Sequence, residues 1–265
     1  MEVICLYIKN YICGHIVEVV ELDRVGGAIG IYRKLDKDNM VNVNTGEVIK
    51  VNHNDSRKDD IASLKKSIRR LRMIINANFS GNLNELFITL TYSENMTDLK
   101  RLYSDFNKFI KRLRYKYGDI NFEYIAVPEP QLRGAWHIHL LLKAVNKEVL
   151  YISNDKIAEL WRQGFTKTER LEQVDNVGAY LSAYLTDLKN DNCKSKGARL
   201  YLYPSGMQLY RSSRGIKKPD VIEGNIGIDD IYKVYESSYD IKDGDKVVNT
   251  VTYKQYNMKR CIIKV

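Results

Sequence analysis

Two histidines separated by one residue are the first side chains in the sequence whose types could do chemistry. His137 and His139 lie in the apolar run WHIHLLL, which has the composition of a β-strand. Alternate residues of a strand project to the same side, so both imidazoles share one face while Trp136, Ile138 and Leu140 face the core. Two such rings can bind one divalent metal ion through a nitrogen each. Two independent histidines on the solvated face of a sheet are the alternative.

A carboxylate and two phenols could complete a site around these rings. Glu129 precedes His137 by eight residues, and a hairpin through PEPQLRGAW would return it beside the histidines. Two imidazoles and one carboxylate, with coordination positions left open, suit Mg²⁺ or Mn²⁺ bound to a phosphate oxygen. Tyr180 and Tyr184 are four residues apart in VGAYLSAYLTD, and a helix would place them on one face. Packing in the core or at an interface is the alternative for this pair.

The flanking sequence predicts the elements that must position these side chains. β-Rich runs predict strands at residues 85–92, 121–129, 135–144 and 164–172. Helical spacing of apolar residues predicts helices at residues 57–78, 98–118, 154–164 and 176–190. For the third helix we expect Asn154 or Asp155 as the N-cap and Gly164 as the stop. This order predicts an α+β fold, an antiparallel sheet with helices packed on it as a sandwich.

Additional β-hairpin elements are predicted towards both ends of the chain. One hairpin is expected at residues 40–53, and a second one is expected about a turn at residues 243–245. We therefore predict a β-rich N-terminal extension, a central domain and a C-terminal β-hairpin extension, at residues 1–56, 57–220 and 221–265.

The charge of the chain favours a polyanionic partner. Its 265 residues carry a formal net charge of +9, which favours nucleic acid or an acidic membrane surface. Between Lys194 and Lys218, basic residues are interleaved with Tyr201, Tyr203 and Tyr210, as expected of a groove for backbone phosphates and stacked bases. A solvated hairpin with an aromatic inner face is the alternative.

No sequence signal directs the chain to a membrane. The start lacks a signal-peptide pattern, and no run approaches the roughly 18 apolar residues of a membrane span. The four cysteines are scattered without a CxxC pair. We therefore expect no zinc ribbon, no membrane partner and a cytoplasmic, reducing setting.

Three motifs together resemble a known superfamily. FITLTY, EPQLRGAWHIHLLL and VGAYLSAYLTD, in this order and spacing, are similar to the three motifs of HUH endonucleases. The resemblance is to the rolling-circle replication initiators of Gram-positive plasmids and filamentous-type phages. SIRRLRMIINANF upstream and SSRGIKKP downstream extend it to residues 61–219.

The resemblance implies a role for each residue of the constellation. His137 and His139 match the metal-binding pair, and Glu129 matches the upstream acidic ligand. Tyr180 matches the nucleophile, which would form a 5′-phosphotyrosyl bond with single-stranded or hairpin origin DNA and leave a free 3′-OH. Tyr184 would serve a second strand transfer, or else pack against the sheet or stack on a base. The sequence has no P-loop, so a host helicase and DNA polymerase would be recruited.

The chain departs from the family pattern at one position. Many relatives carry a lysine three residues after the nucleophile, where this chain has Ala183; Asp187 stands three residues after Tyr184, and Lys189 falls on another helix face. Either Lys143 or Arg214 could replace that lysine. We expect DNA to be bound by Lys143, Arg211, Arg214, Lys217 and Lys218.

Two other functions stay open, and the strand before the histidines has a supporting role in all three. A non-catalytic nucleic-acid-binding module would use the same sheet without cutting DNA. In a structural metal protein, the histidines would only fasten the sheet. In either case Thr89 or Thr91 could hydrogen-bond a ligand histidine.

Overall fold

The computed structural model describes two compact units. Its described residues are 7–23, 32–43, 45–51, 61–172, 174–185, 202–204, 207–243 and 245–260. One unit comprises residues 56–218 and contains the predicted site, and the other combines residues 1–55 with 219–265. Both contain antiparallel sheets, and the four α-helices of the described residues all belong to the first unit, so the predicted α+β class is confirmed.

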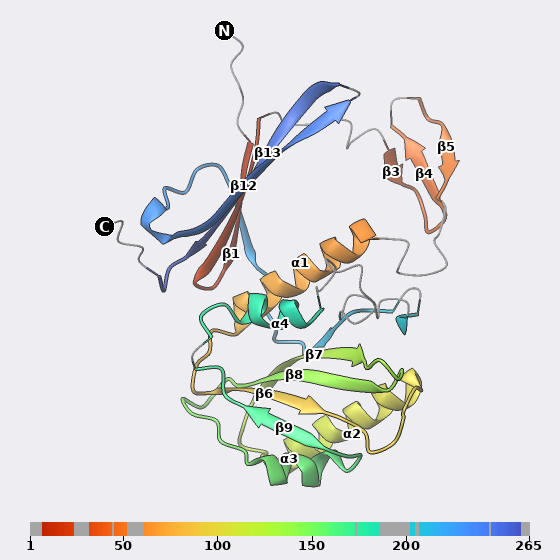
Figure 1. Cartoon of the computed structure of the whole chain (residues 1–265), viewed down its shortest axis with the longest axis vertical. Coiled ribbons are helices and arrows are strands. Elements are labelled where there is room, and N and C mark those ends of the chain that lie inside the picture. Colours follow the sequence, from red (N-terminus) through yellow and green to blue (C-terminus); the bar gives the residue numbers. More distant parts are fainter. Residues whose placement is uncertain are drawn as a thin grey trace. The chain divides into compact units, whose positions relative to one another are not determined.

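A five-stranded antiparallel sheet forms the middle of residues 56–218 (Figure 1). Its order across the sheet is β10 (Arg211–Ser212), β7 (Phe122–Pro130), β8 (Trp136–Ala144), β6 (Glu85–Leu90) and β9 (Thr166–Glu169). The strands predicted at 85–92, 121–129, 135–144 and 164–172 are therefore all present, and the last of them lies at an edge as its short polar sequence favours.

Helices cover both faces of this sheet (Figure 1). Helices α2 (Leu99–Lys116) and α3 (Asn154–Trp161) pack on the face that carries Ile88 and Leu140. Helices α1 (Ile61–Asn78) and α4 (Val177–Leu185) pack on the opposite face, against Phe87 and Leu141. The candidate site belongs to this second face.

Local sequence explains where these helices begin and end. The Asp98 side chain accepts hydrogen bonds from the first N–H groups of α2, and that helix buries Leu102, Phe106, Phe109, Ile110 and Leu113. For α3 the predicted N-cap was wrong, because the hydroxyl of Ser153 accepts from the Lys156 N–H. Asn154 instead accepts a hydrogen bond from Thr166 in β9. The helix ends at Arg162, in the left-handed region with φ 65°, and not at Gly164.

The other unit is built on strands from both ends of the chain. Its larger sheet has the order β11 (Asp220–Glu223), β1 (Tyr7–Cys13), β2 (Ile16–Leu22), β13 (Lys246–Asn257) and β12 (Lys233–Asp243). A small core of Val17, Val19 and Tyr256 lies on it. The 3₁₀-helix η4 (Asp230–Tyr232) precedes β12. The terminal segments, which we predict as separate extensions, thus share one sheet, while the predicted domain limits stay a prediction.

A smaller sheet holds the remaining strands. β3 (Tyr32–Lys34), β4 (Asn39–Asn42) and β5 (Val48–Lys50) pair in that order. The predicted hairpins at both ends are confirmed, as β4–β5 and β12–β13. Among the described residues, every helix is too short or too polar to pass through a lipid bilayer.

Candidate metal centre

The β7–β8 hairpin brings the predicted carboxylate beside the predicted imidazoles. Glu129 and His137 are direct cross-strand partners, and Val127 pairs with His139. The turn between the strands is closed by hydrogen bonds from Gln131 N–H to the Ala135 carbonyl and from Gly134 N–H to the Gln131 carbonyl. Because cross-strand partners project to the same face, all three side chains lie together.

The three side chains converge on one point. The Glu129 Oε2 atom lies 2.9 Å from His139 Nε2 and 3.3 Å from His137 Nε2, and the two Nε2 atoms are 2.9 Å apart. Only 6%, 10% and 11% of the Glu129, His137 and His139 side chains are exposed. The predicted alternation is confirmed on the other face, where Trp136 and Ile138 are buried.

The spacing of these atoms fits a small divalent cation. Adjacent octahedral ligands about 2.1 Å from Mg²⁺ lie roughly 3 Å from one another. That is the separation of the Glu129 oxygen and the two imidazole nitrogens, and all potential ligand atoms of the group lie within 4.8 Å. Within the described residues, this is the one group of three or more His, Cys, Asp or Glu side chains with such spacing.

The electrostatics of the cluster also favour a cation. Burial raises the pKa of the Glu129 carboxyl, but hydrogen bonds and electrostatic attraction from His137 and His139 outweigh burial and hold this pKa well below its ordinary value. The carboxyl is therefore ionised at neutral pH, in the form that binds a metal ion.

Strand β6 supports one of the two imidazoles. Thr89 is the cross-strand partner of His139, and its hydroxyl lies 3.4 Å from His139 Nδ1. A proton on Nδ1 can be donated to Thr89, which leaves the Nε2 lone pair directed at the centre. Phe87 stacks on the same ring at a centroid distance of 5.5 Å. Thr91 plays no such part, because its hydroxyl donates to the Phe165 carbonyl at 2.7 Å.

Tyr180 lies beside this cluster on helix α4. Its ring makes an edge contact with Phe87 at 6.4 Å between centroids, so Phe87 contacts both the phenol and His139. Tyr180 is 37% exposed and therefore accessible. Helix α4 also includes Tyr184, whose side chain lies outside the described part of the chain, as do Asp187 and Lys189.

A buried asparagine on α1 holds the start of α4. The Asn76 side chain accepts a hydrogen bond from Gly178 N–H at 2.7 Å and donates one to Asn176 Oδ1 at 3.0 Å. Asn176 in turn caps α4 by accepting from Ala179 N–H at 2.9 Å. A Cβ atom at Gly178 would collide with the Arg72 carbonyl of α1. No pattern in the sequence indicates the role of Asn76, because its partners are about 100 residues away.

The predicted DNA-binding cations fall into two groups. The Lys143 ammonium is already bound, 3.2 Å from the buried Glu85 carboxylate and 2.9 Å from the Asn78 carbonyl. The others are exposed, on β10 or in the segment after it: Arg211, Arg214, Lys217 and Lys218.

The tyrosines predicted to line a groove also differ from one another. Tyr203 is buried, with its hydroxyl donating to the Pro128 carbonyl at 3.2 Å and its ring against Trp136. It offers no free face to a base. Tyr210 is half-buried, and Tyr201 lies outside the described residues.

Comparison with known proteins supports the predicted resemblance. Residues 85–189 match the model of a family of replication-associated proteins of the ORF2 type. The match spans less than half of the chain, but it contains Glu129, His137, His139 and Tyr180. It is consistent with a rolling-circle replication initiator. No curated protein and no solved structure matches the chain.

Proposed function

We propose that this chain is a metal-dependent enzyme of the HUH type that nicks and rejoins single-stranded DNA at a replication origin. The family matched by residues 85–189 supports a role in replication initiation. The observation that carries the enzymatic part is the convergence of Glu129, His137 and His139 within 3.3 Å, with Tyr180 next to them across Phe87.

The three converging side chains would hold Mg²⁺ or Mn²⁺. When bound, the ion would act as a Lewis acid on a non-bridging oxygen of the scissile phosphate. The Glu129 carboxylate supplies a negative charge, and the imidazoles supply neutral donors without cancelling the charge of the ion. Open coordination positions remain for the phosphate and water.

Tyr180 would be the nucleophile. Its phenolic oxygen would attack the phosphorus in line, forming the Tyr–O–P bond while the bond from phosphorus to the 3′-oxygen breaks. The departing 3′-oxygen takes up a proton and becomes the primer end for a polymerase. A phenol has a reference pKa of about 10, so its proton must pass to a base or solvent as the attack proceeds. Ala183 supplies no cation for this step.

The covalent intermediate would conserve the energy of the broken phosphodiester. A 3′-OH can attack the phosphotyrosyl bond and restore the strand without ATP, and Tyr184 would be available for a second transfer. Origin DNA would enter as a single strand or extruded hairpin, and a host helicase and polymerase would extend it in the cytoplasm.

A covalent-adduct assay tests this proposal. Labelled single-stranded segments covering the replicon that encodes the chain are incubated with the protein and Mn²⁺, and denaturing gels are searched for a protein-linked band. We expect an adduct that disappears in Tyr180→Phe. It should persist in Tyr115→Phe, a matched control on α2 whose side chain is 93% exposed.

Other outcomes lead to different conclusions. An adduct that survives Tyr180→Phe and vanishes in Tyr184→Phe would move the nucleophile to Tyr184. Absence of an adduct with Mg²⁺ and Mn²⁺ alike would favour the second candidate, a non-catalytic nucleic-acid-binding module. The observation that favours this candidate is Ala183, which stands where many relatives have lysine.

A further inference from the structure

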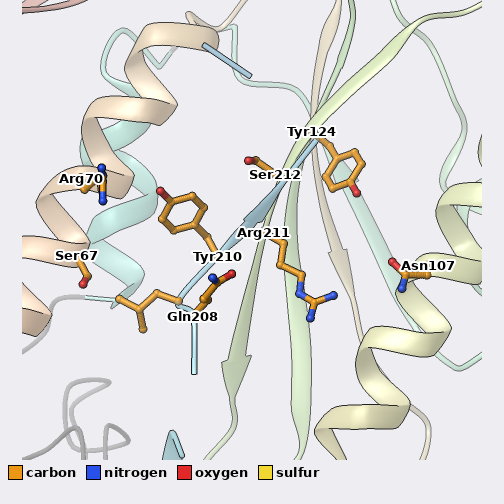
Figure 2. Close-up of a pocket in the computed structure, with 9 residues that line it drawn as sticks. Ser67, Arg70, Asn107, Tyr124, Gln208, Tyr210, Arg211 and Ser212 are labelled. Carbon is orange, nitrogen blue, oxygen red and sulfur yellow. The ribbon is translucent and has the colours of Figure 1, made fainter. Parts of the chain in front are cut away.

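A basic and aromatic pocket lies at the β10 edge of the same sheet, away from the three metal-binding side chains. Its volume is about 590 Å³. Arg70 lines it from α1, Asn107 from α2 and Tyr124 from β7, while Gln208, Tyr210 and Arg211 come from β10 and the residues before it (Figure 2). None of these elements was predicted from the sequence to form a common site.

The pocket is suited to an anion. No carboxylate is found among its described lining residues. Within the described part of the chain, neither Arg70 nor Arg211 forms an ion pair with a carboxylate. The Arg211 guanidinium lies over the Tyr103 ring, 3.5 Å from its centroid, which fixes its plane while leaving its charge uncompensated.

Aromatic rings make up much of the remaining wall. Burial raises the pKa of Tyr124 and of Tyr210, with nearby arginine charges opposing the shift, so both phenols are neutral at physiological pH. Neutral rings can stack on a nucleobase. The Gln208 and Asn107 amides add donors and acceptors of the kind that read base edges.

The pocket surrounds the edge strand rather than one face of the sheet. Arg211 pairs with Ala126 and Ser212 with Ile125 on β7, and β10 has no neighbour on its other side in the described sheet. Consecutive side chains of a strand point to opposite faces. Tyr210 accordingly points towards Arg70 on α1, and Arg211 points towards α2 (Figure 2).

This edge is close to the metal-binding side chains along β7. Ala126, the partner of Arg211, precedes Glu129 by three residues, which corresponds to about 10 Å of extended strand. A single DNA strand that crosses the Glu129–His137–His139 cluster can therefore extend to this pocket with a neighbouring nucleotide.

We propose that the pocket is a subsite for one nucleotide of the single-stranded substrate, outside the scissile bond. The arginines would bind backbone phosphates, and Tyr210 with Tyr124 would contact the base. This inference rests on the proposed function for its substrate, but it concerns different residues and a step that needs no cutting. A free nucleotide presents the same chemistry, so the test separates the two sources.

Binding measurements with Arg70→Gln/Arg211→Gln provide the first test. Fluorescence anisotropy of a labelled oligonucleotide is measured against salt, in a Tyr180→Phe background that leaves the DNA intact. For each lost arginine–phosphate contact we expect the slope of log affinity against log salt to fall by about 0.7. Lys116→Gln is the control. It lies nine residues beyond Asn107 on the opposite side of α2, and its slope should stay unchanged.

Removal of an aromatic ring provides the second measurement. Tyr210→Ala should weaken oligonucleotide binding roughly 5- to 150-fold, the effect of losing one base–aromatic stack. Tyr115→Ala should not weaken it. Because Tyr210 is half-buried, photocrosslinking of the unmodified protein to an oligonucleotide containing 5-iodouracil accompanies this variant. The expected crosslink maps to the peptide of Tyr210 or Tyr124.

Several results would overturn the subsite. These are unchanged salt slopes in the double variant, crosslinks confined to other peptides, and a mononucleotide that binds as tightly as the oligonucleotide. If the wild type forms the covalent adduct while binding ignores Arg70 and Arg211, the subsite fails and the proposed function stands. If binding and crosslinking use the pocket but no adduct forms, the nicking function fails and the subsite stands.

Discussion

At the residue scale, Glu129 is the side chain on which the metal centre depends most. It supplies the only negative charge of the cluster and contacts both imidazoles. Glu129→Gln keeps the shape and removes the charge. We expect the dissociation constant for Mn²⁺ to rise at least tenfold, as measured by electron paramagnetic resonance of the free ion.

Glu123→Gln is the matched control for this substitution. Glu123 is on the same strand, but its carboxylate accepts a hydrogen bond from the Gly215 N–H at 3.1 Å, outside the cluster. Mn²⁺ affinity should be unaffected. Equal affinities for the wild type and Glu129→Gln would mean that the three side chains do not bind the ion.

Thr89 provides a finer test, because it acts on the centre only through His139. Thr89→Val removes the hydroxyl and preserves the branched shape. Loss of the hydroxyl releases the constraint on His139 Nδ1, and we expect Mn²⁺ affinity to fall about tenfold. Thr91→Val loses a hydroxyl that donates to the Phe165 carbonyl, so its Mn²⁺ affinity should equal that of the wild type. A similar loss in both variants would indicate general destabilisation instead.

Some of these residues can be found from sequence and others cannot. The period of two along a strand is enough to place His137 and His139 together and Ile138 opposite. Placing Thr89 against His139 also requires the pairing of β6 with β8, which joins segments 50 residues apart. Lys143 looked free in the sequence because its partner Glu85 lies on that same distant strand.

At the scale of elements, the close packing of α4 on α1 controls where Tyr180 lies. Gly178 makes this approach feasible, since an added Cβ would collide with the Arg72 carbonyl and lie 2.7 Å from Asn76 Oδ1. Gly178→Ala should push α4 away from α1. We expect a loss of about 1–3 kcal/mol in the free energy of unfolding, measured by urea denaturation, together with slower adduct formation.

Gly118→Ala is the comparison for that change. A Cβ atom there would have its nearest neighbour at 3.8 Å, which is ordinary contact. Its unfolding free energy should not fall by more than a few tenths of a kcal/mol. If Gly178→Ala is equally harmless, α4 is not held by this contact and the position of Tyr180 has another cause.

Element boundaries depended on contacts that a sequence does not display. The apolar stripes of α1 and α2 predict both helices well, because burial of one face follows directly from helical periodicity. The cap of α3 was misplaced by one residue. Asn154 is a good capping residue, but its side chain is used by Thr166 and Thr168 of β9, which leaves Ser153 to cap the helix.

At the scale of the whole molecule, strand pairing was the least predictable feature. Alternation along a strand indicates which of its faces is buried, but it does not say which other strand lies beside it. The C-terminal hairpin β12–β13 and the N-terminal hairpin β1–β2 could each be recognised alone. Their union through β2 and β13, with β11 added beside β1, is seen only in the structure.

This shared sheet makes the N-terminal strands dependent on the C-terminal segment. Truncation after Lys218 would remove β11, η4, β12 and β13, and with them the outer neighbour of β1 and of β2. It would also remove Tyr256 from the small core with Val17 and Val19. A two-stranded hairpin alone is marginally stable in water at best. We therefore expect β1–β2 to unfold in the truncated chain.

Residues 56–218 should keep their structure in the same truncated chain, because the sheet that carries Glu129 and His137 draws all its strands from that range. Mn²⁺ affinity should match that of the full chain, while hydrogen exchange of the β1 and β2 amides should accelerate to the rate of an unfolded peptide. Slow exchange of those amides would show that β1–β2 is stabilised without its C-terminal partners. Loss of Mn²⁺ binding would show that the metal centre depends on the other unit.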